Sequence, residues 1–303
     1  MIVRFWGVRG SIPVPGPMTQ RYGGNTSCVQ ADVGINPILI FDAGTGIRRL
    51  GQELAAHTGL DIHLFISHAH WDHIQGLPFF EPLYKPGNRI TFYSRRRDGF
   101  QLSDVIHKII EDPYFPLSHE DWQAHVSYVE IEDGETIEVA PTIRMSSSRL
   151  NHPLIASAYR IDAQGRSFVY VTDTAPFDHM ILDREFISRA PDLSVPVPPE
   201  IAETLGAMRS SLVELCTKAD LVVYDTMFTD EEYRRNPHWG HSAVSHAVAV
   251  CKDAAARRLV IFHHAPEHTD DQMDTFVKEA QTRYADSTLE IHVAVEGRHI
   301  EIE

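Results

Sequence analysis

The chain has few cysteines, no long apolar run and no excess of positive charge. Its three cysteines, Cys28, Cys216 and Cys251, stand far apart and form no CxxC pair. This spacing argues against a disulfide framework or a thiolate zinc cage, and it fits a reducing compartment. No stretch approaches the roughly 20 apolar residues that a membrane-spanning helix needs. Residues 1–6 are typical of a strand rather than a secretory signal, so we expect a cytoplasmic protein that does not contact membranes.

Basic residues are outnumbered by acidic ones. The sequence has 27 Lys and Arg residues and 42 Asp and Glu residues, which gives a formal net charge of −15. Proteins that bind a long polyanion through its phosphates normally carry a basic excess. We therefore expect no long nucleic acid as partner, whereas a small anionic substrate held locally by metal ions is compatible with this charge. The sequence leaves a homodimer open.

The pattern of apolar runs predicts an α/β protein. Hydrophobic residues make up 43% of the 303 residues and charged residues 23%, as in ordinary globular proteins. Short β-branched runs bounded by Gly, Pro, Asn or Asp predict strands at 2–6, 28–33, 38–42, 61–66, 89–93, 142–146, 154–161, 167–172, 220–225, 258–263, 289–295 and 299–302. Helical patterns lie at 46–57, 100–111, 199–218, 242–255 and 270–285. We expect one domain over residues 1–303, with insertions near 94–123 and 186–200.

Histidine is abundant, with 18 residues among 303, and the histidines are clustered along the sequence. The densest cluster, His68-Ala69-His70-Trp71-Asp72-His73, follows an apolar strand. In an extended segment, residues 68, 70 and 72 project to one side, and a turn directly afterwards can bring residue 73 to the same pocket. Imidazole and carboxylate groups are good ligands for zinc-type ions. Four such groups within six residues can serve two adjacent metal ions, although a solvated surface loop is the alternative reading.

Three further residues of the types that bind metal ions lie at positions where they could complete a two-metal site. They are His152, Asp173 and His263, each at the end of an apolar strand or just before one. Strand ends at one edge of a sheet are a common place for a site to be assembled.

These residues resemble the metallo-β-lactamase superfamily, and more narrowly its tRNase Z-like branch, which includes cyclic phosphodiesterases such as the one of phosphonate breakdown. The likeness spans nearly the whole chain, from Gly7-Val8-Arg9-Gly10-Ser11 through 23–28, 41–46 and the His68–His73 block to Gly240-His241-Ser242. It implies a four-layer αβ/βα sandwich with two mixed β-sheets flanked by helices. It further implies that His68, His70 and His152 hold one metal ion, that Asp72, His73 and His263 hold the other, and that Asp173 bridges them. His264 is the alternative to His263; zinc is favoured, and manganese and iron are the other candidates.

Two more residues match an accessory pair of that branch, Asp225 and His241. By the resemblance, the histidine faces the scissile phosphate and the carboxylate orients it. An imidazole held in this way can stabilise or protonate a developing oxyanion. Tyr224 departs from the branch, which usually has histidine at that position, and His241 could instead be a polar residue at a helix N-terminus.

The leading interpretation is therefore a hydrolase with two divalent metal ions that cleaves a small phosphodiester, cyclic ones included. The resemblance further implies that Asp72 doubles as proton acceptor. The alternatives are a thioester or lactone hydrolase on the same metal pair, and a non-haem di-iron sensor without turnover. Residues 154–161 and 167–172 predict a hairpin with Gly165 in its turn. In tRNase Z the tRNA-gripping arm is inserted there, so we expect weak or no processing of precursor tRNA. The roles of Arg95-Arg96-Arg97 and of the Tyr114-Phe115 loop stay open.

Overall fold

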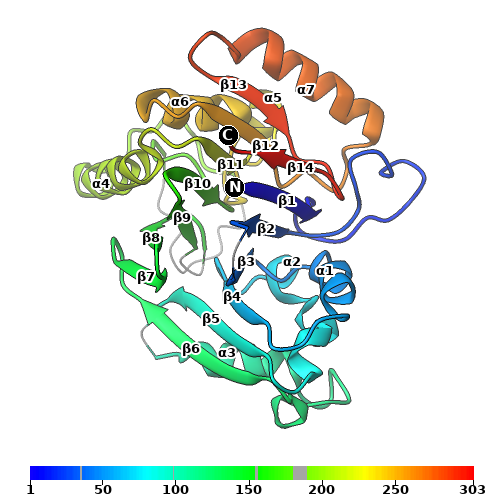
Figure 1. Ribbon diagram of the computed structural model, residues 1–303. Coiled ribbons are helices and arrows are strands. Elements are labelled where there is room, and N and C mark those ends of the chain that lie inside the picture. Colours follow the sequence, from blue (N-terminus) through cyan, green and yellow to red (C-terminus); the bar gives the residue numbers. More distant parts are fainter. Residues whose placement is uncertain (35, 98, 154–155, 180–189) are drawn as a thin grey trace. The chain divides into compact units, whose positions relative to one another are not determined.

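Two compact units make up the described part of the chain, and each contains one mixed seven-stranded β-sheet (Figure 1). The computed structural model describes residues 1–34, 36–97, 99–153, 156–179 and 190–303. Unit 1 comprises Met1–Glu132 and Val295–Glu303, and unit 2 comprises Asp133–Ala294. The single domain expected from the sequence stays a prediction.

The sheet of unit 1 has the strand order β14-β1-β2-β3-β4-β5-β6. In this order, each neighbouring pair from β14 to β3 is antiparallel, and each neighbouring pair from β3 to β6 is parallel. The strands are β1 (Ile2–Gly7), β2 (Cys28–Asp32), β3 (Ile38–Phe41), β4 (Asp61–Phe65), β5 (Arg89–Arg95), β6 (His125–Ile131) and β14 (His299–Glu301). The helices are α1 (Ile47–Leu54), α2 (Trp71–Ile74) and α3 (Leu102–His107), with 3₁₀ turns at Leu77–Phe79, Glu81–Tyr84, Lys108–Ile110 and His119–Asp121.

The sheet of unit 2 has the order β13-β12-β11-β10-β9-β8-β7. Strands β7 to β10 form an antiparallel meander, and β10 to β13 are parallel. The strands are β7 (Thr136–Ala140), β8 (Ile143–Arg149), β9 (Ser157–Ala163), β10 (Arg166–Val171), β11 (Leu221–Asp225), β12 (Arg258–Phe262) and β13 (Glu290–Val293). The helices are α4 (Pro199–Cys216), α5 (Asp230–Arg235), α6 (Val244–Asp253) and α7 (Asp270–Tyr284).

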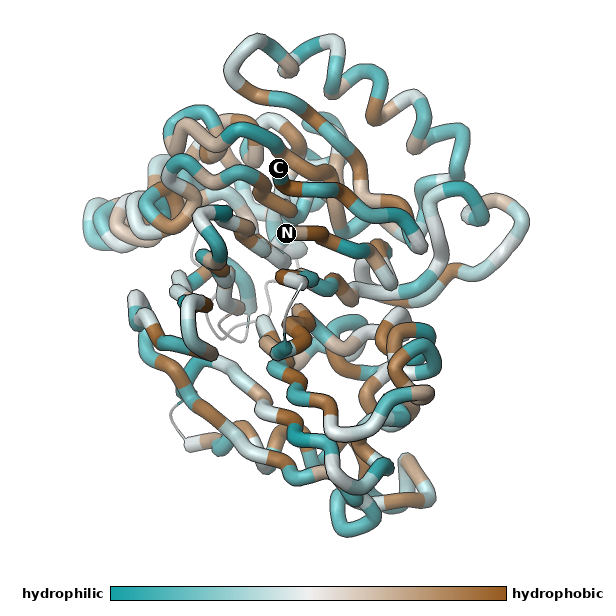
Figure 2. Tube along the Cα trace, in the orientation of Figure 1, coloured by the Kyte–Doolittle hydropathy of each residue, from teal (hydrophilic) through white to brown (hydrophobic). Residues whose placement is uncertain are grey.

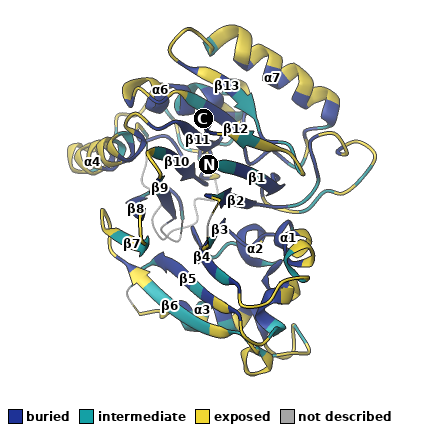
Figure 3. Ribbon diagram, viewed as in Figure 1, coloured by how far each residue is buried: buried dark blue, intermediate teal, exposed yellow. Residues whose placement is uncertain are grey.

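Burial explains why these segments become strands and helices. Every residue of β11 is buried, as expected for a central parallel strand covered on both faces. Helices α4, α6 and α7 contact the strands of unit 2, and their outer faces are exposed and hydrophilic (Figures 2 and 3). Helix α7 begins with a capping box, in which the Thr269 hydroxyl accepts the backbone N–H of Gln272 and the Gln272 side chain accepts the backbone N–H of Thr269.

Each predicted strand and helix corresponds to an observed element with ends shifted by a few residues, and the predicted α/β class with two mixed sheets flanked by helices is confirmed. The sequence reading missed β6, β7 and the short helices α2 and α5. Residues 154–155 of one predicted strand, and residues 186–189 of the predicted proline-rich loop, lie outside the described residues. Residues 190–198 are irregular, and α4 begins directly after them at Pro199. No helix in the described ranges is long and apolar enough to cross a membrane.

Both units bring polar residues to the carboxyl ends of their parallel strands. In unit 1, Asp42 follows β3, and residues 67–73 follow β4. In unit 2, Asp173, Asp225 and His263 follow or end β10, β11 and β12. In open α/β sheets ligands bind at this edge, so the fold positions both sets where a site is expected.

Candidate metal centre

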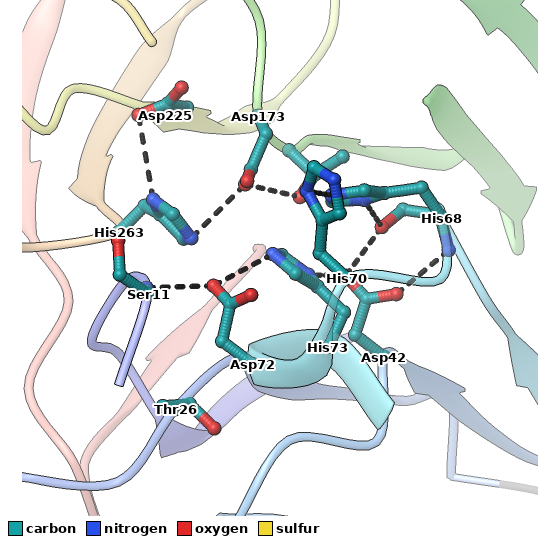
Figure 4. Close-up of polar contacts among 12 residues, drawn as sticks. Ser11, Thr26, Asp42, His68, His70, Asp72, His73, Asp173, Asp225 and His263 are labelled. Carbon is teal, nitrogen blue, oxygen red and sulfur yellow. Dashed lines mark hydrogen bonds and ion pairs between the residues drawn. The ribbon is translucent and has the colours of Figure 1, made fainter. Parts of the chain in front are cut away.

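The block His68–His73 of unit 1 contains four of the seven predicted ligands, which lie as two pairs, His68 with His70 and Asp72 with His73 (Figure 4). His68 is fully buried, and its Nε2 lies 3.0 Å from Nδ1 of His70. His73 is also fully buried, and its Nε2 lies 3.2 Å from Oδ2 of Asp72. Helix α2 begins at Trp71, so the turn comes earlier than the sequence suggests: Asp72 lies in the first turn of the helix and not in the extended segment with His68 and His70.

Asp42 holds this block in place from the neighbouring strand. Phe41 and Phe65 are register partners in the parallel strands β3 and β4, so Asp42 and Ser67 follow side by side. The Asp42 carboxylate accepts hydrogen bonds from the Ser67 N–H and hydroxyl, both at 2.8 Å, and from Nδ1 of His73 at 2.7 Å. Because a carboxylate only accepts, Nδ1 of His73 donates, and the Nε2 lone pair is the one that faces Asp72.

Asp72 is positioned by the backbone of the Gly7–Ser11 segment. The N–H of Ser11 donates to Oδ2 of Asp72 at 2.8 Å. Ser11 has a φ of 64°, and Asp42 has a φ of 59°, both in the left-handed region that non-glycine residues rarely adopt. Such conformations gather at functional sites, where surrounding contacts hold them.

Unit 2 contributes Asp173, Asp225 and His263 from the ends of three adjacent parallel strands (Figure 4). Nε2 of His263 lies 3.1 Å from Oδ1 of Asp173. His263 is fully buried and also adopts the left-handed conformation, with a φ of 61°. Asp173, Asp225, His241 and His263 each present a ligand-type atom, and these four atoms all lie within 4.8 Å of one another.

His152 reaches the same region of unit 2, and its orientation depends on Gly240. Its Nδ1 donates to the Gly240 carbonyl at 2.8 Å, which leaves Nε2 facing Oδ2 of Asp173 at 3.7 Å. Gly240 has a φ of 84°, and a Cβ at this position would lie 2.5 Å from Nδ1 of His152. A side chain at position 240 therefore cannot coexist with this orientation of His152.

His241 and Asp225 form the pair that the sequence suggested. Nδ1 of His241 lies 3.1 Å from Oδ2 of Asp225 and 3.9 Å from Asp173. The Asp225 carboxylate also accepts the N–H of Thr174 at 3.0 Å and that of Met227 at 3.1 Å. It is therefore fixed by backbone donors, as expected of a group that orients an imidazole. His241 keeps slight exposure, at 7%.

The donor chemistry and the spacing of these side chains fit divalent metal ions. Two ligands of one tetrahedral zinc ion, each about 2.0–2.1 Å from it, lie about 3.3 Å apart. Three observed distances are close to that spacing. They are 3.0 Å between His68 and His70, 3.2 Å between His73 and Asp72, and 3.1 Å between His263 and Asp173. Burying carboxylates together with imidazoles is costly unless a cation offsets the charge. His and Asp are ordinary ligands for zinc, manganese and iron.

The remaining predicted residues fall into other roles. Nε2 of His264 donates to the Ala294 carbonyl at 2.9 Å, which favours His263 as the ligand, and the choice stays a proposal. Tyr224 is buried in β11, and burial raises the pKa of its phenol well above the ordinary value, so it is neutral. The three cysteines are free and buried, and burial raises the pKa of each thiol.

The two loop features left open by the sequence lie in unit 1. Arg96 is exposed and pairs with Glu132 at 3.3 Å, whereas Arg95 and Arg97 line a small hollow beside Ala69. The Tyr114 side chain is 75% exposed, and the Phe115 ring packs edge-on against Phe79, with ring centroids 5.4 Å apart.

Three positioning groups were not identified from the sequence: Asp42, the Ser11 backbone and Gly240. Asp42 could have been found, because it is an acidic residue directly after an apolar strand, as Asp173 and Asp225 are. Ser11 acts through its backbone N–H, for which the residue type carries no signal. Gly240 accepts through its carbonyl, and its positive φ and the lack of room for a Cβ are features that a glycine can signal.

Comparisons with known proteins match a family model and several curated relatives. The sequence model of a family described as a β-lactamase superfamily domain matches residues 38–193. A protein of Haloferax volcanii named Ribonuclease Z is 26% identical, over 87% of this chain and 86% of its own length. Further curated relatives, 24–26% identical, carry the same name.

Solved structures match over the whole chain. The metallo-β-lactamase fold protein YhfI of Bacillus subtilis has a TM-score of 0.67 at 18% identity and covers 99% of both chains. The short form of human tRNase Z has a TM-score of 0.64 at 20% identity and covers 100% of both. A diphosphatase of the PhnP family has a TM-score of 0.63 at 17% identity, covering 100% of this chain and 98% of its own. These likenesses confirm the predicted metallo-β-lactamase fold.

The expectation that no long nucleic acid is a partner is wrong. The curated relatives, aligned over most of their length, are ribonucleases by name, and a tRNase Z shares the fold along the whole chain. The net charge of −15 is a sum over the entire surface, whereas binding to phosphates depends on the few cations at the contact. The β9–β10 hairpin is confirmed, with Gln164 and Gly165 in its turn. A short hairpin at one place does not remove other surfaces that can hold RNA.

The prediction of a metal-dependent hydrolase of phosphodiester bonds is confirmed by the same comparisons together with the His and Asp cluster. Because the family model matches more than half of the chain, and because the relatives agree with the tRNase Z-like branch, this chain belongs to the β-lactamase superfamily.

Proposed function

We propose that the ligand-type residues of the two units together hold two divalent metal ions, with zinc favoured over manganese and iron. In this proposal His68, His70 and His152 bind one ion, Asp72, His73 and His263 bind the other, and Asp173 is shared. The observation that carries it is the spacing of 3.0–3.2 Å between ligand atoms within each unit. The family and its fold support the presence of divalent metal ions. The proposal treats residues 1–303 as one catalytic domain.

The protein residues have separate tasks in the proposed hydrolysis of a phosphodiester. When bound, a pair of divalent ions neutralises phosphate charge and lowers the pKa of water. Asp72, held by the Ser11 N–H, accepts the proton of the attacking water. His241 stabilises or protonates the leaving oxygen, and Asp225 keeps the ring of His241 in the required orientation. The buried surroundings of Asp225 strengthen this hydrogen bond.

Two substrate classes follow. The first is a small phosphodiester, cyclic ones included, which agrees with the structural likeness to a diphosphatase of the PhnP family. The second is RNA, which the curated relatives favour by their name, Ribonuclease Z. The Asp225–His241 pair favours phosphodiester hydrolysis over thioester hydrolysis, because an oriented imidazole assists an alkoxide leaving group, whereas a thiolate leaves without a proton. A di-iron sensor does not need that pair.

The test is hydrolysis of bis(p-nitrophenyl) phosphate by the purified full chain after removal of metal and again after addition of zinc, manganese or iron. We expect no turnover by the metal-free protein and restored turnover after addition. The Asp173→Asn variant should stay inactive under all conditions, whereas Asp253→Asn, which changes an exposed carboxylate paired with Arg209, should behave as the wild type. Turnover of a thioester but not of the phosphodiester would contradict the proposal.

A further inference from the structure

A hollow of about 460 Å³ opens at one end of the unit 2 sheet, around the β9–β10 hairpin. It is lined by the start of β10 at Arg166 and by Lys218 and Asp220, which precede β11. Asp173 and Asp225 stand at the other ends of these two parallel strands. Seven residues separate Arg166 from Asp173, which at 3.3 Å per residue is roughly 20 Å. The hollow is therefore remote from the metal-ligand residues of its own unit.

The walls of this hollow carry more positive than negative charge. Its lining includes four cations, Arg144, Arg160, Arg166 and Lys218, against two carboxylates, Asp162 and Asp220. This is a local excess of two positive charges in a chain whose net charge is −15. An excess of this sign attracts an anion.

Both carboxylates already have intramolecular partners. Asp162 accepts two hydrogen bonds from Arg160, at 2.8 and 2.9 Å. Arg160 also donates to the carbonyls of Leu215 and Thr217, at the end of α4, so its guanidinium is already held by partners within the protein. Asp220 accepts the Ser167 N–H at 2.9 Å and pairs with Arg257 at 3.2 Å from outside the hollow.

Three cations are left over: Arg144, Arg166 and Lys218. None of these side chains has an ion pair or a hydrogen bond within the residues that the structure describes. Arg144 and Lys218 are exposed, and Arg166 is half-buried. Arg144 and Asp162 are register partners in β8 and β9, so their side chains share one face of the sheet. Three cations around one open hollow, with no partner among the described residues, can contact more than one phosphate, as the backbone of a nucleic acid offers.

We propose that Arg144, Arg166 and Lys218, the basic hollow, bind the sugar–phosphate backbone of an RNA substrate at a distance from the bond that is cut. The inference rests on the proposed action on RNA. A mononucleotide or bis(p-nitrophenyl) phosphate is too short to span roughly 20 Å from the metal-ligand residues. The basic hollow therefore contributes to the affinity for long RNA and not to the hydrolysis of a small phosphodiester.

The test compares two triple variants of the full chain. Arg144→Ala/Arg166→Ala/Lys218→Ala removes the basic hollow. The control Arg89→Ala/Arg235→Ala/Lys252→Ala removes three exposed cations that pair elsewhere, with the same change in net charge. Binding of a fluorescein-labelled precursor tRNA with a 3′ trailer is measured by anisotropy in EDTA over a salt series. Hydrolysis of bis(p-nitrophenyl) phosphate is measured in parallel with metal present.

We expect the first variant to bind the RNA at least about tenfold more weakly, with a slope of log K against log salt reduced by about 2, because three phosphate contacts are lost. The control should bind as the wild type, both variants should hydrolyse bis(p-nitrophenyl) phosphate normally, and Arg144→Lys/Arg166→Lys should keep most of the affinity. Equal loss in both triple variants, no loss in either, or no binding by the wild type would overturn the inference. Absence of bis(p-nitrophenyl) phosphate hydrolysis by the wild type would instead count against the proposed function.

Discussion

Nδ1 of His241 lies 3.1 Å from the carboxylate of Asp225, which two backbone N–H groups hold in place. If His241 acts on the phosphate and not as a ligand, His241→Ala should keep its metal ions and lose about 10²–10⁴-fold in kcat, the scale of a positioned general acid. Asp225→Asn should lose less, because the imidazole remains. Steady-state kinetics with metal analysis checks both. Loss of metal would reassign His241 as a ligand, and unchanged turnover would exclude His241 from the catalytic step.

Replacing Gly240 should disturb a ligand that stands 88 residues away in the chain. In Gly240→Ala the new Cβ would meet Nδ1 of His152 at 2.5 Å, and a φ of 84° disfavours any side chain. We expect metal affinity to fall about 10–100-fold, as for other losses of a group that orients a ligand. Gly134→Ala is the matched control, because Gly134 has a φ of 71° with open space around it. Equal metal affinities in competition with a chelator would refute the orienting role.

Asp42→Asn tests the support of His73. An amide at position 42 keeps one acceptor oxygen but loses the charge that the Ser67 and His73 donors share. We expect weaker metal binding, by about 10–100-fold, with kcat restored at saturating metal. Asp32→Asn in the same sheet serves as control, since Asp32 lies away from the ligand block. If the two variants titrate with metal identically, Asp42 does not support the site.

The stability of unit 2 should depend on Glu232 at low pH. A hydrogen bond from His268, followed by those of Thr229, lowers the pKa of Glu232 to about 2, against about 4.3 in an unfolded chain. A depressed pKa contributes stability that is complete above the unfolded value and is lost as the pH falls through the folded value. Between pH 5 and 2, Glu232→Gln should therefore show a flatter decline of Tm than the wild type, and Glu203→Gln, which is exposed, should not. Parallel profiles for all three proteins would exclude this contribution.

Much of this fold could be predicted from the sequence because its central strands are apolar runs that end at polar residues. The fully buried β11 is an example, and Asp225 at its end was identified with it. Strands β6 and β7 were missed because each is the edge strand of its sheet and is mostly half-buried or exposed, so its alternation is weak.

The candidate site could be predicted as far as side chains carry the chemistry. The seven ligand candidates were identified from residue types and strand ends. Asp42 and Gly240 act through contacts across 31 and 88 residues, which depend on strand register and on a loop path. The expectation about nucleic acid failed for a related reason. A total charge does not show where cations gather on the surface, as Arg144, Arg166 and Lys218 do around one hollow.

The central claim is a pair of divalent ions that act together on a phosphodiester. The most direct measurement titrates the metal-free full chain with zinc while bound metal and bis(p-nitrophenyl) phosphate hydrolysis are followed in the same sample. The account predicts that each chain binds two ions and that turnover needs both. The Asp173→Ala variant should lose at least one ion and nearly all of its turnover. Full turnover with one ion per chain, or an Asp173→Ala variant that keeps both ions and its activity, would contradict it.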